Sequence, residues 1–397
     1  MDSRAPADAR IVDWLGTSQA AMESLLGRIV DIDSPSSHVA GINAVGDEIA
    51  SFLTEHGIAV ERAGNEGSAR LLKVSVNGNA DAPPILLMGH MDTVFPLGTA
   101  PARPFEARGD RLHGPGVADM KSGLVMNAFV LAAFAQFGDG QPLDGLFTID
   151  EEIASPVSRD FILDAARDAA FVLNAEPARK NGNVVIERKG GLFLRIEVSG
   201  KSAHAGVDFV SGVSAISELA HKIVALGALT DIPDEITVNV GLVSGGQSIN
   251  TVAPRAGASV DIRYAREEQR ASILEKVGGI VDAMDVPGTT ARLEIIGEFL
   301  PMMPTADSLA LLKSYREASA SLGLGVEGEA TGGCSDAGLT ASLGVPTLCG
   351  TGPVGGNAHT DDEYIERDSL VTRAQALALV ILRHRSERRK TAVSDRN

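Results

Sequence analysis

Hydrophobic and polar positions show two different periodicities along the first part of the chain. Runs of about four to eight apolar residues with polar flanks predict buried strands, and apolar positions three or four apart predict helices. The two signals take turns, which is typical of α/β proteins. The predicted strands cover residues 70–78, 83–90, 144–150 and 169–177, and the predicted helices cover residues 21–32, 42–57, 123–138 and 158–169.

The order of the predicted elements changes after residue 190. From residue 191 the pattern predicts strand, helix, two strands, helix and strand, which is the β-α-β-β-α-β order of ferredoxin-like folds. A helix-rich α/β pattern resumes after residue 303 and continues to the end. The sequence therefore predicts one larger domain, formed by residues 1–190 and 304–397, with a smaller domain of residues 191–303 inserted into it.

Length and charge limit the class of protein. The chain has 397 residues, more than the roughly 250–300 that one core usually serves, so two domains are expected. Its 35 basic and 52 acidic residues give a net charge of −17, which argues against nucleic acid or an anionic membrane as partner. No run reaches about 18 unbroken apolar residues, and the N-terminus does not read as a leader. We expect a cytoplasmic protein.

Polar residues stand where several predicted strands end or where glycine-rich loops follow. In sheets with parallel strands these ends meet at one edge, where ligands bind. Imidazole and carboxylate suit Zn²⁺ or a similar divalent ion, and the presence of only two cysteines leaves these groups to hold it. The candidates are His90, Asp92, Asp119, Glu151, Glu152, Glu176 and His359.

Two ions suit this many carboxylates better than one. Two metals about 3.5–4 Å apart need an anion between them, and Asp119, in the glycine-rich loop before a predicted helix, is the best candidate to bridge them. Each feature alone has a structural alternative. His90 and Asp92 could form a polar turn, and Glu151 and Glu152 could be a charge cluster at a helix N-terminus. Their joint occurrence at successive strand ends favours the metal centre.

The motifs, in this order and spacing, closely resemble the di-zinc peptidase family of carboxypeptidase G, aminoacylase and acetylornithine deacetylase. The resemblance spans nearly the whole chain and implies a three-layer α/β catalytic domain of the zinc-peptidase kind with an inserted ferredoxin-like domain for dimerisation and lid closure. It rests on the segments GHMDTVFP, GPGVADMKSG, DEE, EP, SGKSAHAG, INTVAPRA, DIRY and GGNAHTDDEY.

The resemblance also assigns ligands and implies the metals. Zn²⁺ is the expected ion, with Co²⁺ or Mn²⁺ as alternatives. Asp92 would bind no metal but would accept a hydrogen bond from the far ring nitrogen of His90 and fix its orientation. A cis peptide bond is implied before Met120. One ion would be bound by His90, Asp119 and Glu176, and the other by Asp119, Glu152 and His359.

Catalytic and substrate-binding roles follow from the same resemblance. Glu151, adjacent to a ligand, would act as general base and then general acid. His204 would stabilise the oxyanion in the active site of the other subunit of a homodimer. The substrate-binding positions would be Asn250 and Arg263, expected on neighbouring strands, together with Gly333. A thiol at Cys334 is interpreted as a small hydrophobe near the pocket floor.

These features predict hydrolysis of an amide by a metal-bridging water, with release of a C-terminal amino acid such as glutamate from an N-acyl amino acid, a folate-type compound or a short peptide. An N-acyl-amino-acid deacylase and an aminohydrolase acting on an aromatic amine are the alternatives, because both would use the same water and the same base. A non-catalytic binding homologue would have lost a ligand or the base, and all of these positions are intact here.

Overall fold

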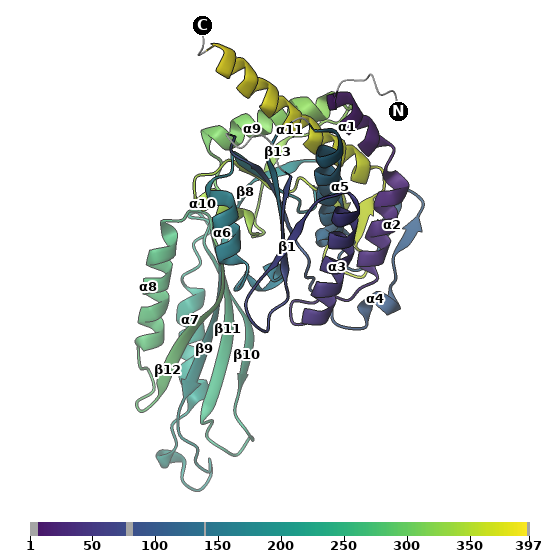
Figure 1. Ribbon diagram of the computed structural model, residues 1–397. Helices are drawn as coiled ribbons and strands as arrows, with labels where there is room; N and C mark the ends of the chain where they lie inside the picture. The colour runs from purple at the N-terminus through teal and green to yellow at the C-terminus, as the bar shows by residue number, and fades with distance from the viewer. Residues whose placement is uncertain (1–6, 77–81, 139, 395–397) are drawn as a thin grey trace. The chain divides into compact units, whose positions relative to one another are not determined.

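The computed structural model describes residues 7–76, 82–138 and 140–394, and the chain divides into two compact units (Figure 1). Unit 1 contains residues 1–187, 304–331 and 339–397, and unit 2 contains residues 188–303 and 332–338. The smaller unit thus interrupts the larger one in the chain, and the short segment 332–338 returns to it. The independent domains predicted from the sequence, with limits at residues 190 and 303, stay a prediction.

A mixed six-stranded sheet forms the centre of unit 1. Strand β3 is buried at every residue, and it runs parallel to β6 on one side and to β7 on the other. Strand β14 continues the parallel part beyond β7, whereas β2 and β1 add an antiparallel edge beyond β6. The order is β1 (Val60–Ala63), β2 (Leu71–Val76), β6 (Leu143–Thr148), β3 (Ile85–His90), β7 (Phe171–Asn174) and β14 (Thr347–Leu348).

Helices cover both faces of this sheet. A Cβ at Gly145 of β6 would contact Leu131 of α5, whereas the next residue, Leu146, lines a hollow together with Phe161 of α6. Since neighbouring residues of a strand point to opposite faces, α5 and α6 lie on opposite sides. The helices of unit 1 are α1 (Ala7–Gly16), α2 (Gln19–Val30), α3 (Val39–Glu55), α4 (Thr99–Ala102), α5 (Ser122–Phe137), α6 (Arg159–Arg167), α9 (Ala306–Ala320), α10 (Ala337–Ser342, which begins in unit 2) and α11 (Ser369–Ser394).

Helix α5 is the central core helix of unit 1. It is apolar on all sides, and α1, α2, α3 and α11 all pack against it. By length and composition the stretch Val117–Phe137 could cross a membrane, but 94% of its most apolar window is buried inside the protein. A helix that is hydrophobic all round is buried either in lipid or in a large core, and the packing of α5 corresponds to the core.

Two smaller sheets complete unit 1. Strand β8 (Val184–Arg188) pairs with β13 (Gly328–Thr331). A four-stranded sheet joins segments that lie about 250 residues apart in the chain, as in the pairing of Tyr364 with His113. Its order is β15 (Gly355–Gly356), β16 (Tyr364–Glu366), β5 (Arg111–His113) and β4 (Glu106–Arg108).

Unit 2 is an antiparallel four-stranded sheet with two helices. The inward positions of the strands alternate with exposed ones, as in β9, and helices α7 and α8 pack on the buried face to form a separate core. The order β10-β11-β9-β12 places β10 and β12 at the edges. The elements are β9 (Gly190–Ser199), α7 (Ala215–Gly227), β10 (Thr237–Gly245), β11 (Arg255–Tyr264), α8 (Gln269–Asp282) and β12 (Thr290–Phe299).

The predicted fold is confirmed in class and in element order. The β-α-β-β-α-β prediction matches unit 2, and the predicted strands and helices of residues 21–177 all have counterparts. The second predicted helix ends two residues early, at Glu55, because Gly57 adopts a left-handed conformation that ends the helix. Apart from β7, the strands of two to four residues were not predicted, since so short a segment carries little periodicity.

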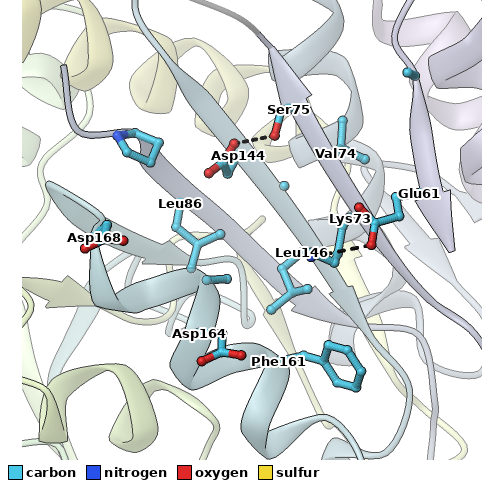
Figure 2. A pocket seen from close by; sticks show the side chains of 14 residues that line it. Glu61, Lys73, Val74, Ser75, Leu86, Asp144, Leu146, Phe161, Asp164 and Asp168 are labelled. Carbon is cyan, nitrogen blue, oxygen red and sulfur yellow. Dashed lines mark hydrogen bonds and ion pairs between the residues drawn. The ribbon is translucent and has the colours of Figure 1, made fainter. Parts of the chain in front are cut away.

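A hollow opens on the α6 face of the unit 1 sheet (Figure 2). Its floor includes Leu86 and Leu146, and its rim carries carboxylates such as Asp144, which accepts a hydrogen bond from Ser75. No residue of the candidate metal centre lines this hollow among the described residues. The chemistry predicted from the sequence therefore lies elsewhere in unit 1.

Close packing between α5 and β7 generates a prediction. A methyl group at Gly123 would lie 2.1 Å from the main-chain oxygen of Ala175. Gly123→Ala must therefore displace α5 or the chain beside Glu176, and we expect a loss of about 1–3 kcal/mol in the free energy of unfolding, measured by chemical denaturation.

The matched control is Gly278→Ala in the middle of α8, where nothing lies within 4 Å of an added Cβ. Alanine has the higher helix propensity, so this variant should be about 0.5–1 kcal/mol more stable than the wild type. A Gly123→Ala protein as stable as the wild type would show that the contact between α5 and β7 is not tight.

Candidate metal centre

Three parallel strands bring the predicted strand-end residues to one edge of the sheet. His90 is the last residue of β3. Glu151 and Glu152 form the short turn η2 (Glu151–Ile153) directly after β6, and Glu176 follows β7. Because β6, β3 and β7 are parallel neighbours, their carboxyl ends coincide, as expected for a ligand-binding edge.

Asp119 lies in a tight turn, η1 (Val117–Lys121), just before α5. The predicted cis peptide bond between Asp119 and Met120 is present. The two carboxylate oxygens of Asp119 face different histidines: Oδ1 lies 3.2 Å from Nε2 of His90, and Oδ2 lies 3.3 Å from Nε2 of His359. This is the arrangement expected of a carboxylate shared between two ions.

Two groups of possible ligand atoms result, and they share Asp119. In the first, Oε1 of Glu176 lies 3.6 Å from Nε2 of His90. In the second, Oε2 of Glu152 lies 3.6 Å from Nε2 of His359. Within each group the ligand atoms all lie within 4.8 Å of one another. The structure thus assembles from distant segments the two sets that the resemblance implied.

The electrostatics of the cluster favour added positive charge. Burial raises the pKa of Glu152 to about 8, and the carboxylate of Asp119 adds to this rise. The hydrogen bond to Asp119, opposed by burial, raises the pKa of His359 to about 9. Burial opposes ionisation of His90, but its contacts with Asp119, Asp92 and Glu176 raise its pKa well above the usual range. In the metal-free protein, protons therefore balance part of the negative charge.

The donor set fits two divalent cations. Oε1 of Glu152 is buried and has no hydrogen-bond partner among the described residues, so this oxygen is available to bind a cation. Imidazole nitrogens and carboxylate oxygens are ligands that Zn²⁺, Co²⁺ and Mn²⁺ accept. The identity of the ion stays a prediction.

Asp92 organises more of the centre than the sequence predicted. Nδ1 of His90 lies 3.0 Å from the main-chain oxygen of Asp92 and 3.3 Å from its Oδ1, so the ring is oriented by both groups. The carboxylate also accepts the main-chain N–H groups of Glu151 and Glu152, each at 3.1 Å. It therefore fixes the turn that carries one ligand of the second group as well as the ring of His90.

Glu151 lies beside the ligands without belonging to either group among the described residues. Its Oε2 is 3.9 Å from Nε2 of His90, and the residue is 8% exposed, so its carboxylate lies beside the first ligand group and keeps a small solvent-accessible surface. This is the position that a proton-transferring group requires. Its catalytic role stays a prediction.

His204 and Asn250 lie close together in unit 2. His204 forms an isolated bridge with Thr251, and the main-chain N–H of Ala205 donates to the oxygen of Asn250 at 2.9 Å. Both side chains are exposed. Asn250 lies in the loop between β10 and β11, so its expected position on a strand next to Arg263 is wrong, because β10 ends at Gly245.

Arg263 lies near the other end of β11, where its guanidinium has protein partners. It donates to both carboxylate oxygens of Asp261, and Nη1 lies 2.6 Å from Sγ of Cys334. Gly333 is adjacent, and its main-chain oxygen accepts a hydrogen bond from Arg188. The interpretation of Cys334 as only a small hydrophobe is therefore wrong, since its sulfur accepts from Arg263.

Sequence reasoning missed three residues around the ligands. Ser36 donates to Asp92 at 2.6 Å, and no motif indicated it. Lys121 is buried and donates to the main-chain oxygen of Ile32, and burial lowers its pKa to about 7. Glu363 accepts hydrogen bonds from the loop of Asp119. Its position four residues after His359, in the same motif, was the available signal.

Comparison with known proteins places these features in a family. The family model described as Peptidase family M20/M25/M40 matches residues 86–383. Carboxypeptidase G2 from Pseudomonas sp. (strain RS-16) is 28% identical over 377 residues, which is 92% of this chain and 89% of that protein.

Solved structures agree with the fold. The M20 family metallo-carboxypeptidase Sso-CP2 from Sulfolobus solfataricus matches with a TM-score of 0.77 and 17% identity, covering 92% of this chain and 98% of its own. The YXEP protein of Bacillus subtilis, described as a dinuclear metal-binding peptidase from the M20 family, matches with a TM-score of 0.63 and 15% identity, covering 91% of this chain and 97% of its own. At these identities the likeness concerns the fold.

Metal stoichiometry tests the shared ligand. We expect equilibrium dialysis of the chelator-treated protein against Zn²⁺ to give two tightly bound ions per chain. Glu176→Ala and His359→Ala should each lose one ion, whereas Asp119→Ala should lose both, because Asp119 belongs to both groups. Two ions retained by Asp119→Ala would rule out the bridging arrangement.

The affinity should rise with pH. Metals bind neutral imidazole and ionised carboxylate, whereas His359, with a pKa of about 9, and Glu152, with a pKa of about 8, hold protons at pH 7 in the metal-free protein. Binding must expel these protons, so the apparent affinity should increase as the pH rises towards about 9. Calorimetry in buffers of different ionisation enthalpy measures the protons released, and zero release at pH 7 would contradict these protonation states.

Proposed function

The chain belongs to peptidase family M20/M25/M40, and from this we propose that it is a two-metal carboxypeptidase that releases a C-terminal amino acid, glutamate first among them, from an N-acyl amino acid, a folate-type amide or a short peptide. As a member of this family it is a hydrolase of the metallopeptidase class. The bond and the leaving amino acid are the parts proposed here.

The observation that carries the proposal is the sharing of Asp119 by two ligand groups, with the carboxylate of Glu151 beside them. A site that only stored metal would not require a further buried carboxylate next to the ligands. Hydrolysis of an amide does require one, because the attacking water must lose a proton and the leaving amine must gain one.

The residues divide this work between them. When bound, the two ions supply Lewis acidity that activates a water and polarises the amide carbonyl. Glu151 takes the proton of the attacking water and then delivers it to the amine nitrogen as the bond to carbon breaks. Asp92 keeps the turn of Glu151 and Glu152 fixed through its two main-chain hydrogen bonds, so the carboxylate of Glu151 does not have to reorganise between the two steps.

The choice of a C-terminal amino acid rests on similarity and on one side chain. The chain is similar over most of its length to carboxypeptidase G2. Arg263 offers a guanidinium, which recognises carboxylates by paired hydrogen bonds. An incoming carboxylate would replace Asp261 or Cys334 as its partner. The cytoplasmic location expected from the sequence stays a prediction.

A substrate screen with a matched variant tests the function. The Zn²⁺-loaded protein should release amino acid from N-acyl glutamates and folate analogues, and blocking the terminal carboxylate as an amide should abolish release. Glu151→Gln should bind both ions but turn over about 10²–10⁴ times more slowly, as expected for the loss of an acid–base group.

The outcomes separate the alternatives. Release of glutamate is measured directly with an amino-acid assay. Preferred cleavage of other N-acyl amino acids would indicate a general deacylase. Release of an aromatic amine from substrates without an amino acid would indicate an aminohydrolase. Near-normal turnover of Glu151→Gln with both ions bound would exclude Glu151 as the base.

We also propose that the protein works as a homodimer in which His204 serves the partner's active site. The support lies in unit 2, where α7 and the edge strand β10 expose apolar side chains such as Val224 (75% exposed), Leu242 (70%) and Val243 (60%). An unpaired edge and an apolar surface of this kind can meet the same surface of a second copy across a two-fold axis.

Subunit exchange tests His204. Homodimers of His204→Ala and of Glu151→Gln should both be nearly inactive. Mixing them should restore about a quarter of wild-type activity, because half of the dimers then carry one site with its own Glu151 and the partner's imidazole. An inactive mixture, with exchange demonstrated by native mass spectrometry, would mean that His204 acts within its own chain or only as a turn residue.

A further inference from the structure

The carboxylate of Glu363 accepts hydrogen bonds from three main-chain N–H groups of one loop. Oε2 accepts from Gly116 at 3.1 Å, and Oε1 accepts from Ala118 at 2.8 Å and from Asp119 at 2.9 Å. Glu363 is 1% exposed. The loop turns at Gly116, whose φ of 72° is left-handed, so that its N–H groups point towards one place. A buried anion of the protein itself fills the position that a bound anion takes in other loops of this kind.

This arrangement is costly for the fold. Burial disfavours the charge of Glu363, and the carboxylate of Asp119 nearby repels it. A neutral side chain at this position would avoid both penalties. The three hydrogen bonds offset the cost, and what they fix is the main chain of the residue that both ligand groups share.

The position of Glu363 in the chain connects this loop with a second ligand. His359 lies four residues earlier, with a left-handed φ of 64°, and the loop closes through a hydrogen bond from the N–H of Glu363 to the oxygen of Thr360. Strand β16 begins at the next residue, Tyr364, and pairs with His113 just before the loop of Asp119. Glu363 therefore stands at the junction of two ligand-bearing loops that are about 240 residues apart in the chain.

We propose that Glu363 is a positioning residue that holds the bridging Asp119 in register with His359, so that one carboxylate sets the spacing of both metal sites. The inference rests on the proposed function only in taking the two ligand groups as metal sites. The Nε2 atoms of His90 and His359 lie 3.2 and 3.3 Å from opposite oxygens of Asp119, so a small rotation of its main chain moves one oxygen away from each site.

The test is metal binding by Glu363→Gln. Glutamine keeps the size but replaces one oxygen with an NH₂ group, which would face N–H donors of the loop. We expect the affinity for both Zn²⁺ ions, measured by equilibrium dialysis, to fall by about 10–100-fold, the usual effect of removing a group that orients a ligand. The visible absorption spectrum of the Co²⁺-loaded protein should change in the bands of both bound ions. Glu363→Asp, which keeps the charge but withdraws it, should lie between wild type and Glu363→Gln.

Two reference variants sharpen the result. Glu366→Gln, in strand β16 three residues after Glu363, removes only a partly exposed ion pair with Arg111 and should leave both affinities unchanged. His359→Ala should lower the affinity for one of the two ions alone. The melting temperature of the chelated protein reports any purely structural effect, and the metal-induced rise in melting temperature should be smaller in Glu363→Gln than in Glu366→Gln.

Three results would overturn the proposal. The first is unchanged affinity for both ions in folded Glu363→Gln, and the second is loss of one ion alone, as in His359→Ala. If Glu363→Gln does not fold, wild-type affinity in Glu363→Asp is the third. None of these measurements needs a substrate. A wild-type protein that fails to bind two ions would contradict the proposed function, whereas normal binding by the variant contradicts only the role of Glu363.

Discussion

The main physical constraint on unit 1 is the repulsion between the carboxylates that lie together at one edge of its central sheet. Asp119, Glu151, Glu152 and Glu176 lie within reach of two imidazoles in a largely buried place. Such a cluster is stable only when positive charge enters it, either as protons, which the raised pKa values of His359 and Glu152 indicate, or as metal ions. Much of the surrounding architecture serves to hold these groups together against their mutual repulsion.

Rigid elements supply that restraint. Three parallel strands end together, and α5 packs so closely behind them that Gly123 has no room for a methyl group. Main-chain N–H groups provide a second restraint. Asp92 fixes the turn of Glu151 and Glu152, and Glu363 accepts three N–H groups from the loop of Asp119. Both anions lie behind the ligands, where they act on main chain and ring orientation rather than on an ion.

The sequence predicted what periodicity and strand ends encode. Alternating apolar runs indicated the strands, and the placement of His90 and Glu176 at their carboxyl ends followed from how parallel strands align. Interactions that depend on the third dimension were missed. No role was predicted for Glu363, because its hydrogen bonds join segments about 240 residues apart, and nothing near Cys334 in the chain indicates contact with Arg263, 71 residues away. Asn250 was expected on a strand from the resemblance alone, whereas β10 ends at Gly245, five residues before it.

Because unit 2 interrupts unit 1 in the chain, the residues of the two ligand groups are synthesised at different times. The residues of the first ligand group, His90, Asp119 and Glu176, have all been synthesised when less than half of the chain has been translated. His359 and Glu363 emerge only after the whole of unit 2 and α9. At about 5–20 residues per second, about 9–37 s pass between the synthesis of Glu176 and that of His359, and during this time the chain contains every residue of the first group but lacks His359 of the second. The residues of the first ligand group are therefore all present in the chain before the second group is complete.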